Sequence, residues 1–313
     1  MTVIALLGIL IVAAVGFGWL ATWIWSKNDA LVHWPGTVAA GFVACACVAA
    51  AGVGLVGVYR LDAPRRATPP VTHSRSRDEL VRGEHLAYLC VRCHSASDSL
   101  PLPGGTKNFL ASPERTLGDL YAPNLTSGGP IRTWSDGDVV RAIREGVDNA
   151  GRPLLGHPAR DFHVMSDADV DALVVYLRAQ PPVSSETPPK RLGLLGTLLV
   201  GAGQYPVDVQ PPVVDVLPAP SIGGTPEHGH YLVTISGCAD CHGTTLRGGT
   251  SGFPPDLIAI AAAWTSDEFV HTLRTGRNPL GGVVGPRMPW QDFARAYSDE
   301  ELAAIYAYVR SLT

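Results

Sequence analysis

Charged residues are scarce in this chain: they make up 17% of its 313 residues, whereas 46% are hydrophobic. The formal net charge is -4, so the chain lacks the basic surplus of a protein that binds nucleic acid. Six cysteines are present, but Cys45 and Cys47 lie in an apolar run and the other four form two Cys-x-x-Cys pairs. This arrangement excludes a simple disulfide framework. The length accommodates two small domains and membrane segments.

Two long stretches at the N-terminus lack charge altogether. The first runs from Thr2 to Trp25, and the second runs from Trp34 to Tyr59. Each stretch is long enough to cross about 30 Å of hydrocarbon as a helix. A cleaved signal peptide is the alternative for the first stretch, but that stretch is long and has no basic start. We therefore predict two transmembrane helices within residues 1–59, at about 2–25 and 34–59, in contact with the lipid bilayer.

Small residues recur along one side of the second apolar stretch. Gly41, Cys45 and Ala49 follow one another at four-residue intervals, and Gly57 continues the same stripe. Small residues at this spacing let two helices approach closely. The partner of this face is either the chain's own first helix or a helix of another subunit, and the sequence favours neither.

Two segments carry the pattern Cys-x-x-Cys-His. Two thiols at this spacing lie on one helical turn and can each form a thioether to a haem vinyl group, while the adjacent histidine reaches the iron. A four-thiol zinc site and a thioredoxin-like pair are the alternatives, but neither predicts a histidine directly after both pairs. The motifs therefore predict two covalently bound haem c groups, held by Cys90, Cys93, His94, Cys238, Cys241 and His242.

The sequence around these motifs is duplicated. The segment that begins with Trp134-Ser135 and ends in Arg-x-Gly returns at Trp264-Thr265, 130 residues further along. Each copy then closes with an amphipathic helical pattern, at residues 168–179 and 300–312. Capping-box pairs mark four helix starts, at Ser135, Ser166, Thr265 and Ser298. These patterns predict an all-α soluble part.

Together these features resemble class I cytochrome c domains. The resemblance covers residues 78–313 and rests on a helix leading into Cys-x-x-Cys-His, a middle helix from Trp-Ser or Trp-Thr to Arg-x-Gly, and a closing Tyr-x-Arg helix. The sequence is similar to the membrane-bound dihaem or trihaem cytochrome subunits of periplasmic alcohol and sugar dehydrogenases. It is also similar to the dihaem subunit of cbb3-type oxidases. The resemblance implies an all-α fold with two N-terminal transmembrane helices followed by two class I cytochrome c domains.

The resemblance also implies how the chain is divided and where it resides. Because the family attaches haem outside the cytoplasm, the soluble part is expected on the periplasmic side of a bacterial inner membrane. A positive-inside count would instead place the soluble part in the cytoplasm, because five arginines follow the second helix. The resemblance overrides this count. In the proline-rich linker, the apolar segment Leu192–Gly203 is too short to span a bilayer and is expected to dock or to lie at the interface. The expected parts are the helices at 1–59, a juxtamembrane linker at 60–77, cytochrome c domains at 78–182 and 226–313, and the proline-rich linker at 183–225.

Each haem iron also needs a distal ligand. In the second copy, Met288-Pro289 stands just before the closing helix, where the family places its axial methionine. The first copy has His157-Pro158 at the aligned position, so its haem is predicted to have two histidine ligands. Met165 is the main alternative to His157, and His163 is a weaker one. The predicted iron ligands are therefore His94, His157, His242 and Met288.

Two six-coordinate haem irons, without another nucleophile or acid–base constellation, predict an electron relay rather than an enzyme. The resemblance implies a subunit of a larger respiratory or photosynthetic complex. Its expected partners are a donor or acceptor redox protein, such as a dehydrogenase, and membrane-embedded subunits that contact the transmembrane helices. A dihaem cytochrome c peroxidase-like enzyme is the alternative, because a dissociating His157 would open an iron site. Since thioether sulfur favours ferrous iron, the first haem is expected to have the lower potential.

Overall fold

The computed structural model describes residues 2–27, 30–62, 77–112, 117–205, 207–249 and 254–313. These residues are mostly helical and belong to two compact units. Most of the expected juxtamembrane linker lies outside the described residues. The first unit comprises residues 1–64, 108–121 and 188–207, and the second comprises residues 65–107, 122–187 and 208–313.

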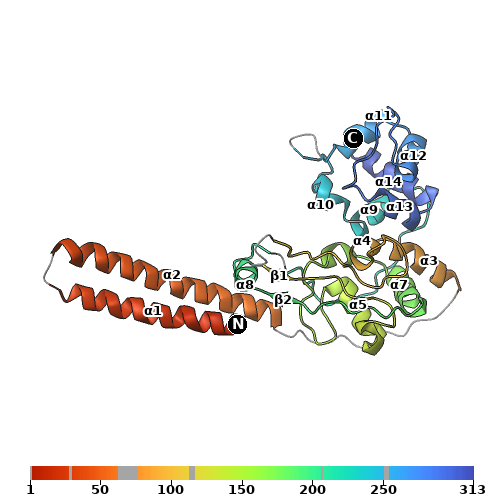
Figure 1. Ribbon diagram of the computed structural model, residues 1–313. Helices are drawn as coiled ribbons and strands as arrows, with labels where there is room; N and C mark the ends of the chain where they lie inside the picture. The colour runs from red at the N-terminus through yellow and green to blue at the C-terminus, as the bar shows by residue number, and fades with distance from the viewer. Residues whose placement is uncertain (1, 28–29, 63–76, 113–116, 206, 250–253) are drawn as a thin grey trace. The chain divides into compact units, whose positions relative to one another are not determined.

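A helical hairpin forms most of the first unit. Helices α1 (Val3–Trp25) and α2 (Ala30–Asp62) lie side by side along their lengths (Figure 1). Both are long and apolar enough to cross a membrane. Large apolar side chains on their outer surfaces are exposed, including Ile4 at 72% and Phe42 at 75%. An apolar surface of this extent requires a cover, either lipid or protein.

A short apolar segment of the expected linker completes the first unit. It forms α8 (Leu194–Gly201), which packs against α2. Just before it, β2 (Arg191–Leu192) pairs antiparallel with β1 (Gly118–Asp119). The apolar linker segment is thus a docked helix, which was one of the two expected outcomes. The β1–β2 pair was not predicted, because two-residue strands leave no period in the sequence.

The glycines of α2 face different surroundings. A Cβ atom on Gly54 would lie 2.3 Å from the Leu7 side chain of α1, and one on Gly57 would lie 2.1 Å from the Thr197 carbonyl oxygen of α8. Around Gly41 the space is open. Of the small-residue face, α8 therefore covers the end at Gly57, while the part around Gly41 is open.

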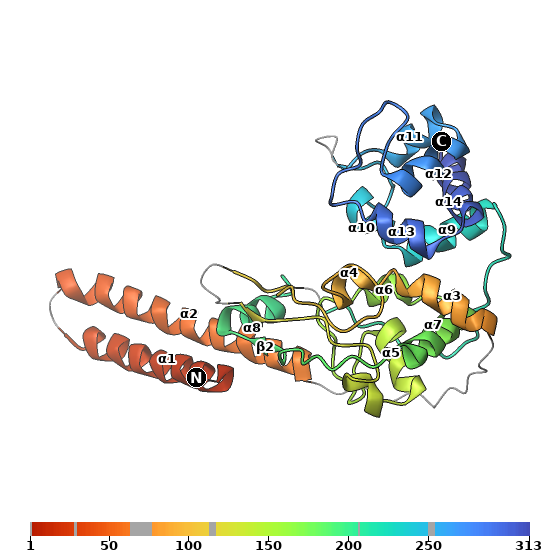
Figure 2. The same cartoon turned by 45° about the vertical axis from the view of Figure 1, so that its right-hand side comes forward.

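The second unit contains both copies of the repeat. Figure 2 shows α3 beside α7 in the first copy and α9 beside α14 in the second. The helices of the first copy are α3 (Arg77–Ala87), α4 (Val91–His94), the 3-10 helix η1 (Pro130–Thr133), α5 (Asp136–Glu145), α6 (Ala159–Phe162) and α7 (Asp167–Ala179). Those of the second are α9 (Pro226–Ile235), α10 (Cys238–His242), α11 (Leu257–Ala263), α12 (Ser266–Thr275), α13 (Trp290–Ala296) and α14 (Asp299–Ser311).

In each copy the first and last helices cross at a glycine. A Cβ atom on Gly83 would lie 1.9 Å from the Ala172 carbonyl oxygen, and one on Gly229 would lie 1.9 Å from the Ala304 carbonyl oxygen. Any larger residue would force the helices apart, because real Cβ atoms do not approach backbone so closely. The first and last helices thus pack against each other in the same way in both copies.

The predicted helix starts are confirmed, with one difference among them. Ser135, Thr265 and Ser298 each take part in a reciprocal capping box. The Ser166 side chain also accepts a hydrogen bond from the backbone of Asp169, three residues later. The Asp169 carboxylate, however, binds side chains of two other helices instead of closing the box.

Candidate haem sites

The two Cys-x-x-Cys-His motifs lie on short helices, and the second cysteine is more exposed in α10 than in α4. Cys90 caps α4, and Cys238 begins α10 directly after Gly237, whose φ of 62° lies in the left-handed region. Both first cysteines pack against the hydrophobic core. Burial, and then the neighbouring thiol of the same motif, raises the pKa of Cys90 and of Cys238 to about 12. A buried thiol of this kind has little thiolate character of its own.

The histidine of each motif is oriented in the same way. The Nδ1 atom of His94 lies 2.7 Å from the Pro123 carbonyl oxygen, and that of His242 lies 2.9 Å from the Pro255 carbonyl oxygen. A carbonyl only accepts, so Nδ1 donates the proton and Nε2 keeps its lone pair for a metal. Sequence reasoning missed both prolines, because the distance along the chain from histidine to proline differs between the copies.

His157 lies close to His94 in the first copy. Burial first, and then the nearby His94 imidazole, lowers the pKa of His157 to about 4. The Nδ1 atom of His157 is buried and has no hydrogen-bond partner. A buried polar atom without a partner is costly, and such atoms mark sites that an absent group completes. This donor set fits a haem group, for which His94 and His157 could both act as iron ligands.

The alternatives to His157 have different surroundings. Met165 is 1% exposed and belongs to the hydrophobic core, and its carbonyl oxygen accepts a hydrogen bond from Arg144. The Nδ1 atom of His163 lies 3.2 Å from the Arg144 carbonyl oxygen. In the second copy, Met288 is half-buried against the core in the loop just before α13. The thioether of Met288 is thus nearer to the surface than that of Met165.

The family model for cytochrome c matches residues 227–313. The chain contains a cytochrome c domain. That domain implies haem c, and the matched residues include the motif of α10. Over the described residues, no group of three or more His, Cys, Asp or Glu side chains is arranged to hold a metal ion.

The chain is also distantly related to cytochrome subunits of dehydrogenases. It is 29% identical over 279 residues to a nicotinate dehydrogenase subunit of Pseudomonas putida, covering 78% of this chain and 22% of that protein. It is 23% identical over 275 residues to the fructose dehydrogenase cytochrome subunit of Gluconobacter japonicus, covering 82% of this chain and 53% of that protein. The third similarity, 30% over 97 residues, is to the cytochrome c subunit of the quinone alcohol dehydrogenase of Gluconobacter oxydans, covering 26% and 20%. The chain thus spans about a fifth and about half of the first two relatives.

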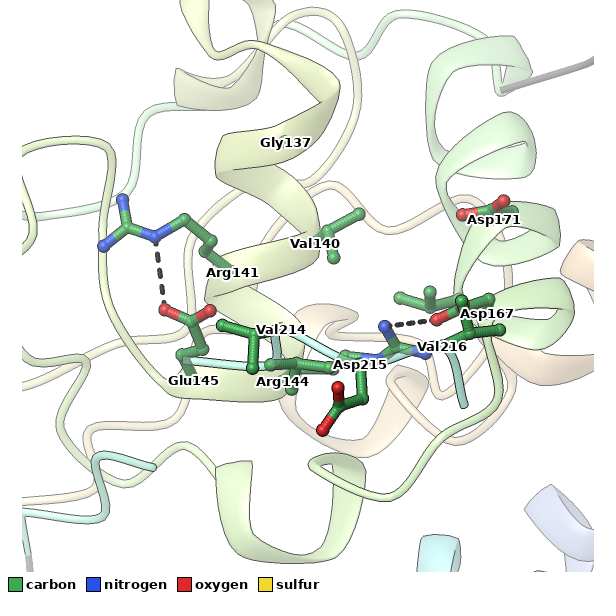
Figure 3. Close-up of a pocket in the computed structure, with 12 residues that line it drawn as sticks. Gly137, Val140, Arg141, Arg144, Glu145, Asp167, Asp171, Val214, Asp215 and Val216 are labelled. Atoms are coloured by element: carbon green, nitrogen blue, oxygen red, sulfur yellow. Dashed lines mark hydrogen bonds and ion pairs between the residues drawn. The ribbon is translucent and has the colours of Figure 1, made fainter. Parts of the chain in front are cut away.

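A cavity of about 260 Å³ lies beside α5 and α7 of the first copy (Figure 3). On its wall Arg141 pairs with Glu145 at 3.2 Å, and Arg144 pairs with Asp167 at 2.8 Å. The linker residues 213–216 form the remaining side. None of the lining residues is a predicted haem-binding residue, so we assign this cavity no part in the haem sites.

Proposed function

We propose that this chain is a membrane-anchored dihaem c-type cytochrome that relays electrons from a periplasmic dehydrogenase to an acceptor at the bacterial inner membrane. The observation that carries the proposal is the equivalence of the two motifs. In both, a Cys-x-x-Cys-His helix places its histidine Nδ1 against a proline carbonyl. This equivalence supports a haem in the first copy as well as in the cytochrome c domain of the second.

In this proposal each haem has two attachment cysteines and two iron ligands. Cys90 and Cys93 attach the first haem, and His94 and His157 supply its iron ligands, which gives the orphaned His157 imidazole a partner. Cys238 and Cys241 attach the second, with the ligands His242 and Met288. Each bound haem supplies a reversible one-electron centre. Two imidazoles stabilise ferric iron more than imidazole and thioether do, so electrons run from the first copy to the second.

The relatives suggest the class of partner. Their names share a dehydrogenase and differ in its substrate, so we infer a dehydrogenase complex without choosing a substrate. The hairpin of α1 and α2 serves as the membrane anchor in this proposal. The open part of the small-residue face of α2 around Gly41 is the place for a helix of a neighbouring subunit.

Haem staining of denaturing gels tests the two attachment sites. Cys90→Ala and Cys238→Ala should each lose about half of the stain, because each motif carries one covalent haem. Cys45→Ala, in α2, is the matched control and should keep all of it. Unchanged staining in Cys90→Ala would refute the first haem.

Carbon monoxide and mild purification test the relay itself. Two six-coordinate haems should change little when carbon monoxide is added to the reduced protein. A strong carbon monoxide spectrum would instead favour the peroxidase-like alternative. After extraction in mild detergent, a dehydrogenase subunit should co-purify with this chain, and the substrate of that dehydrogenase should reduce both haems. Isolation of the full chain without such a subunit would contradict the dehydrogenase assignment.

A further inference from the structure

The guanidinium of Arg82 lies between carboxylates from both copies of the repeat. Its Nε atom donates to Asp169 Oδ1 at 2.7 Å, at the start of the closing helix of its own copy. Its Nη1 atom donates to Glu301 Oε1 at 2.5 Å, at the start of the closing helix of the other copy. The two carboxylate side chains are only 10% and 9% exposed. Ion pairs this well buried resist screening by solvent.

A second contact joins the two copies in the opposite direction, from the first helix of the second copy to the closing helix of the first. Tyr231, on the first helix of the second copy, donates its hydroxyl hydrogen to Asp169 Oδ2 at 2.6 Å. The same hydroxyl oxygen accepts a hydrogen bond from the backbone N–H of Ser166 at 3.0 Å. The first helix of each copy therefore reaches the start of the closing helix of the other. This explains why Asp169 does not close its own capping box.

The haem-attachment motifs take part in the same interface. Arg92 and Asp240 occupy the same position in the two motifs, and each faces a residue of the other copy. Arg92 Nε lies 3.4 Å from Asp292 Oδ2 in α13, and Arg160 Nη2 in α6 lies 2.9 Å from Asp240 Oδ1. Since α6 and α13 follow the two predicted distal ligands, each attachment motif meets the distal side of the other copy.

We propose that these contacts hold the two haem-binding copies in one fixed orientation, with Arg82 at the centre, and thereby set the rate of electron transfer between them. The proposal rests on the proposed function, since it requires a haem in each copy. The step moves one electron: the iron of the first copy goes from ferrous to ferric, and the iron of the second goes from ferric to ferrous. No bond is made or broken and no proton moves.

Arg82 carries more of this orientation than the outer pairs do. Arg92 is 49% exposed and Arg160 is 69% exposed, and pairs this open contribute little to stability. Removing Arg82 would leave Asp169 and Glu301 as two buried, uncompensated negative charges on facing surfaces. Such a loss is strongly unfavourable, whereas removing all three charges together is close to neutral. The two cases are therefore separable by experiment.

The experiment measures electron equilibration between the haems of the full chain in detergent after photochemical one-electron reduction. Arg82→Met should slow equilibration about tenfold, which corresponds to a tenfold smaller docked fraction. The triple variant Arg82→Met/Asp169→Asn/Glu301→Gln removes the charges but keeps the capping oxygen of residue 301 and the acceptor for Tyr231 at residue 169. It should therefore regain the wild-type rate within about threefold. Haem content and the spectrum of each haem should not change in either variant, because neither substitution touches an attachment residue or a ligand.

A single substitution and its matched control keep the test open if Arg82→Met fails to fold. Glu301→Gln removes the charge that reaches across the interface and should slow equilibration about threefold. Glu268→Gln makes the same change in the capping box of α12, within one copy, and should leave the rate unchanged. Wild-type rates in both Arg82→Met and Glu301→Gln, with both haems present, would overturn the proposed orientation. A wild-type chain with only one haem would overturn the proposed function instead.

Discussion

The two copies of the repeat agree in how they are packed and differ at the predicted distal ligand. In both copies the first and last helices cross at a glycine, and the motif histidine lies against a proline carbonyl. The first copy has His157 before α6, whereas the second has Met288 before α13. The packing of the first and last helices is thus the same in both copies, while the residue at the predicted distal position differs.

The loop that leads to the distal residue diverges as well. In the second copy it exposes apolar side chains, with Leu280 at 89% and Val283 at 72%. In the first copy the corresponding turn is fastened by an ion pair of 2.8 Å between Arg152 and Asp148. Differences between the copies should therefore appear in redox behaviour and surface contacts, and similarities should appear in folding.

The largest expected effect tests what the copies share. Gly83→Val and Gly229→Val each insert a side chain where a Cβ atom alone would lie 1.9 Å from a carbonyl oxygen. Each should destabilise its own copy by more than about 3 kcal/mol and cost that copy its haem, so total haem staining falls by about half. Gly224→Ala is the control, because nothing lies within 4 Å of its Cβ position. Full staining in either valine variant would show that the helices do not cross there.

The distal ligands give the next largest effect. His157→Met should raise the lower step of a redox titration on the order of 0.1 V and add a sulfur-to-iron band in the far red, because thioether favours ferrous iron. The reciprocal change, Met288→His, should lower the upper step by a similar amount. Together the two substitutions exchange the redox characters of the copies.

Met165→Leu is the control for the ligand assignment. The side chain of Met165 is buried in the core, and leucine preserves its volume and apolar character. Both redox steps should stay in place in this variant. Movement of the lower step in Met165→Leu, with no movement in His157→Met, would make Met165 the ligand.

Much of the fold could be predicted because its signals are local. The capping boxes at Ser135, Thr265 and Ser298 mark helix starts through residues three apart. The two apolar N-terminal stretches form helices within a few residues of their predicted bounds. The predicted haem-attachment residues lie on short helices, as the motif spacing requires.

The features that could not be predicted depend on residues far apart in the sequence. The bond between Arg82 and Glu301 joins residues 219 positions apart, and neither residue forms part of a recognisable motif with the other. Glu301 does have a local signature as a capping residue, which conceals its second contact. The helix crossings at glycine could not be predicted either. A glycine inside a helical pattern lowers the helix propensity, but it does not indicate which segment packs against it.

The smallest expected effect concerns two aspartates at equivalent positions, Asp161 in α6 and Asp292 in α13. Asp161 meets the like charge of Asp240, and burial first and then this charge raises the pKa of Asp161 to about 6. Burial also raises the pKa of Asp292, but the opposite charge of Arg92 lowers it in part. The pH dependence of stability should therefore be steeper at Asp161.

The sign follows from proton binding. A carboxyl group with a raised pKa binds its proton more tightly in the folded chain than in the unfolded chain, where the value is 3.8. The stability that this proton contributes is complete below pH 3.8 and is lost as the pH rises through about 6. Asp161→Asn removes that loss, so it should flatten the dependence below pH 6 and stabilise the folded chain above it by roughly 2 kcal/mol, a figure reduced for the partial exposure of the carboxyl group to solvent. Asp292→Asn should stabilise less, because it gives up the closer ion pair, 3.4 Å to Arg92 against 3.9 Å between Asp161 and Arg160. Denaturant midpoints followed through haem absorbance between pH 4 and pH 7 measure both variants, and equal pH slopes in Asp161→Asn and the wild type would refute the proximity of Asp161 and Asp240 in the folded protein.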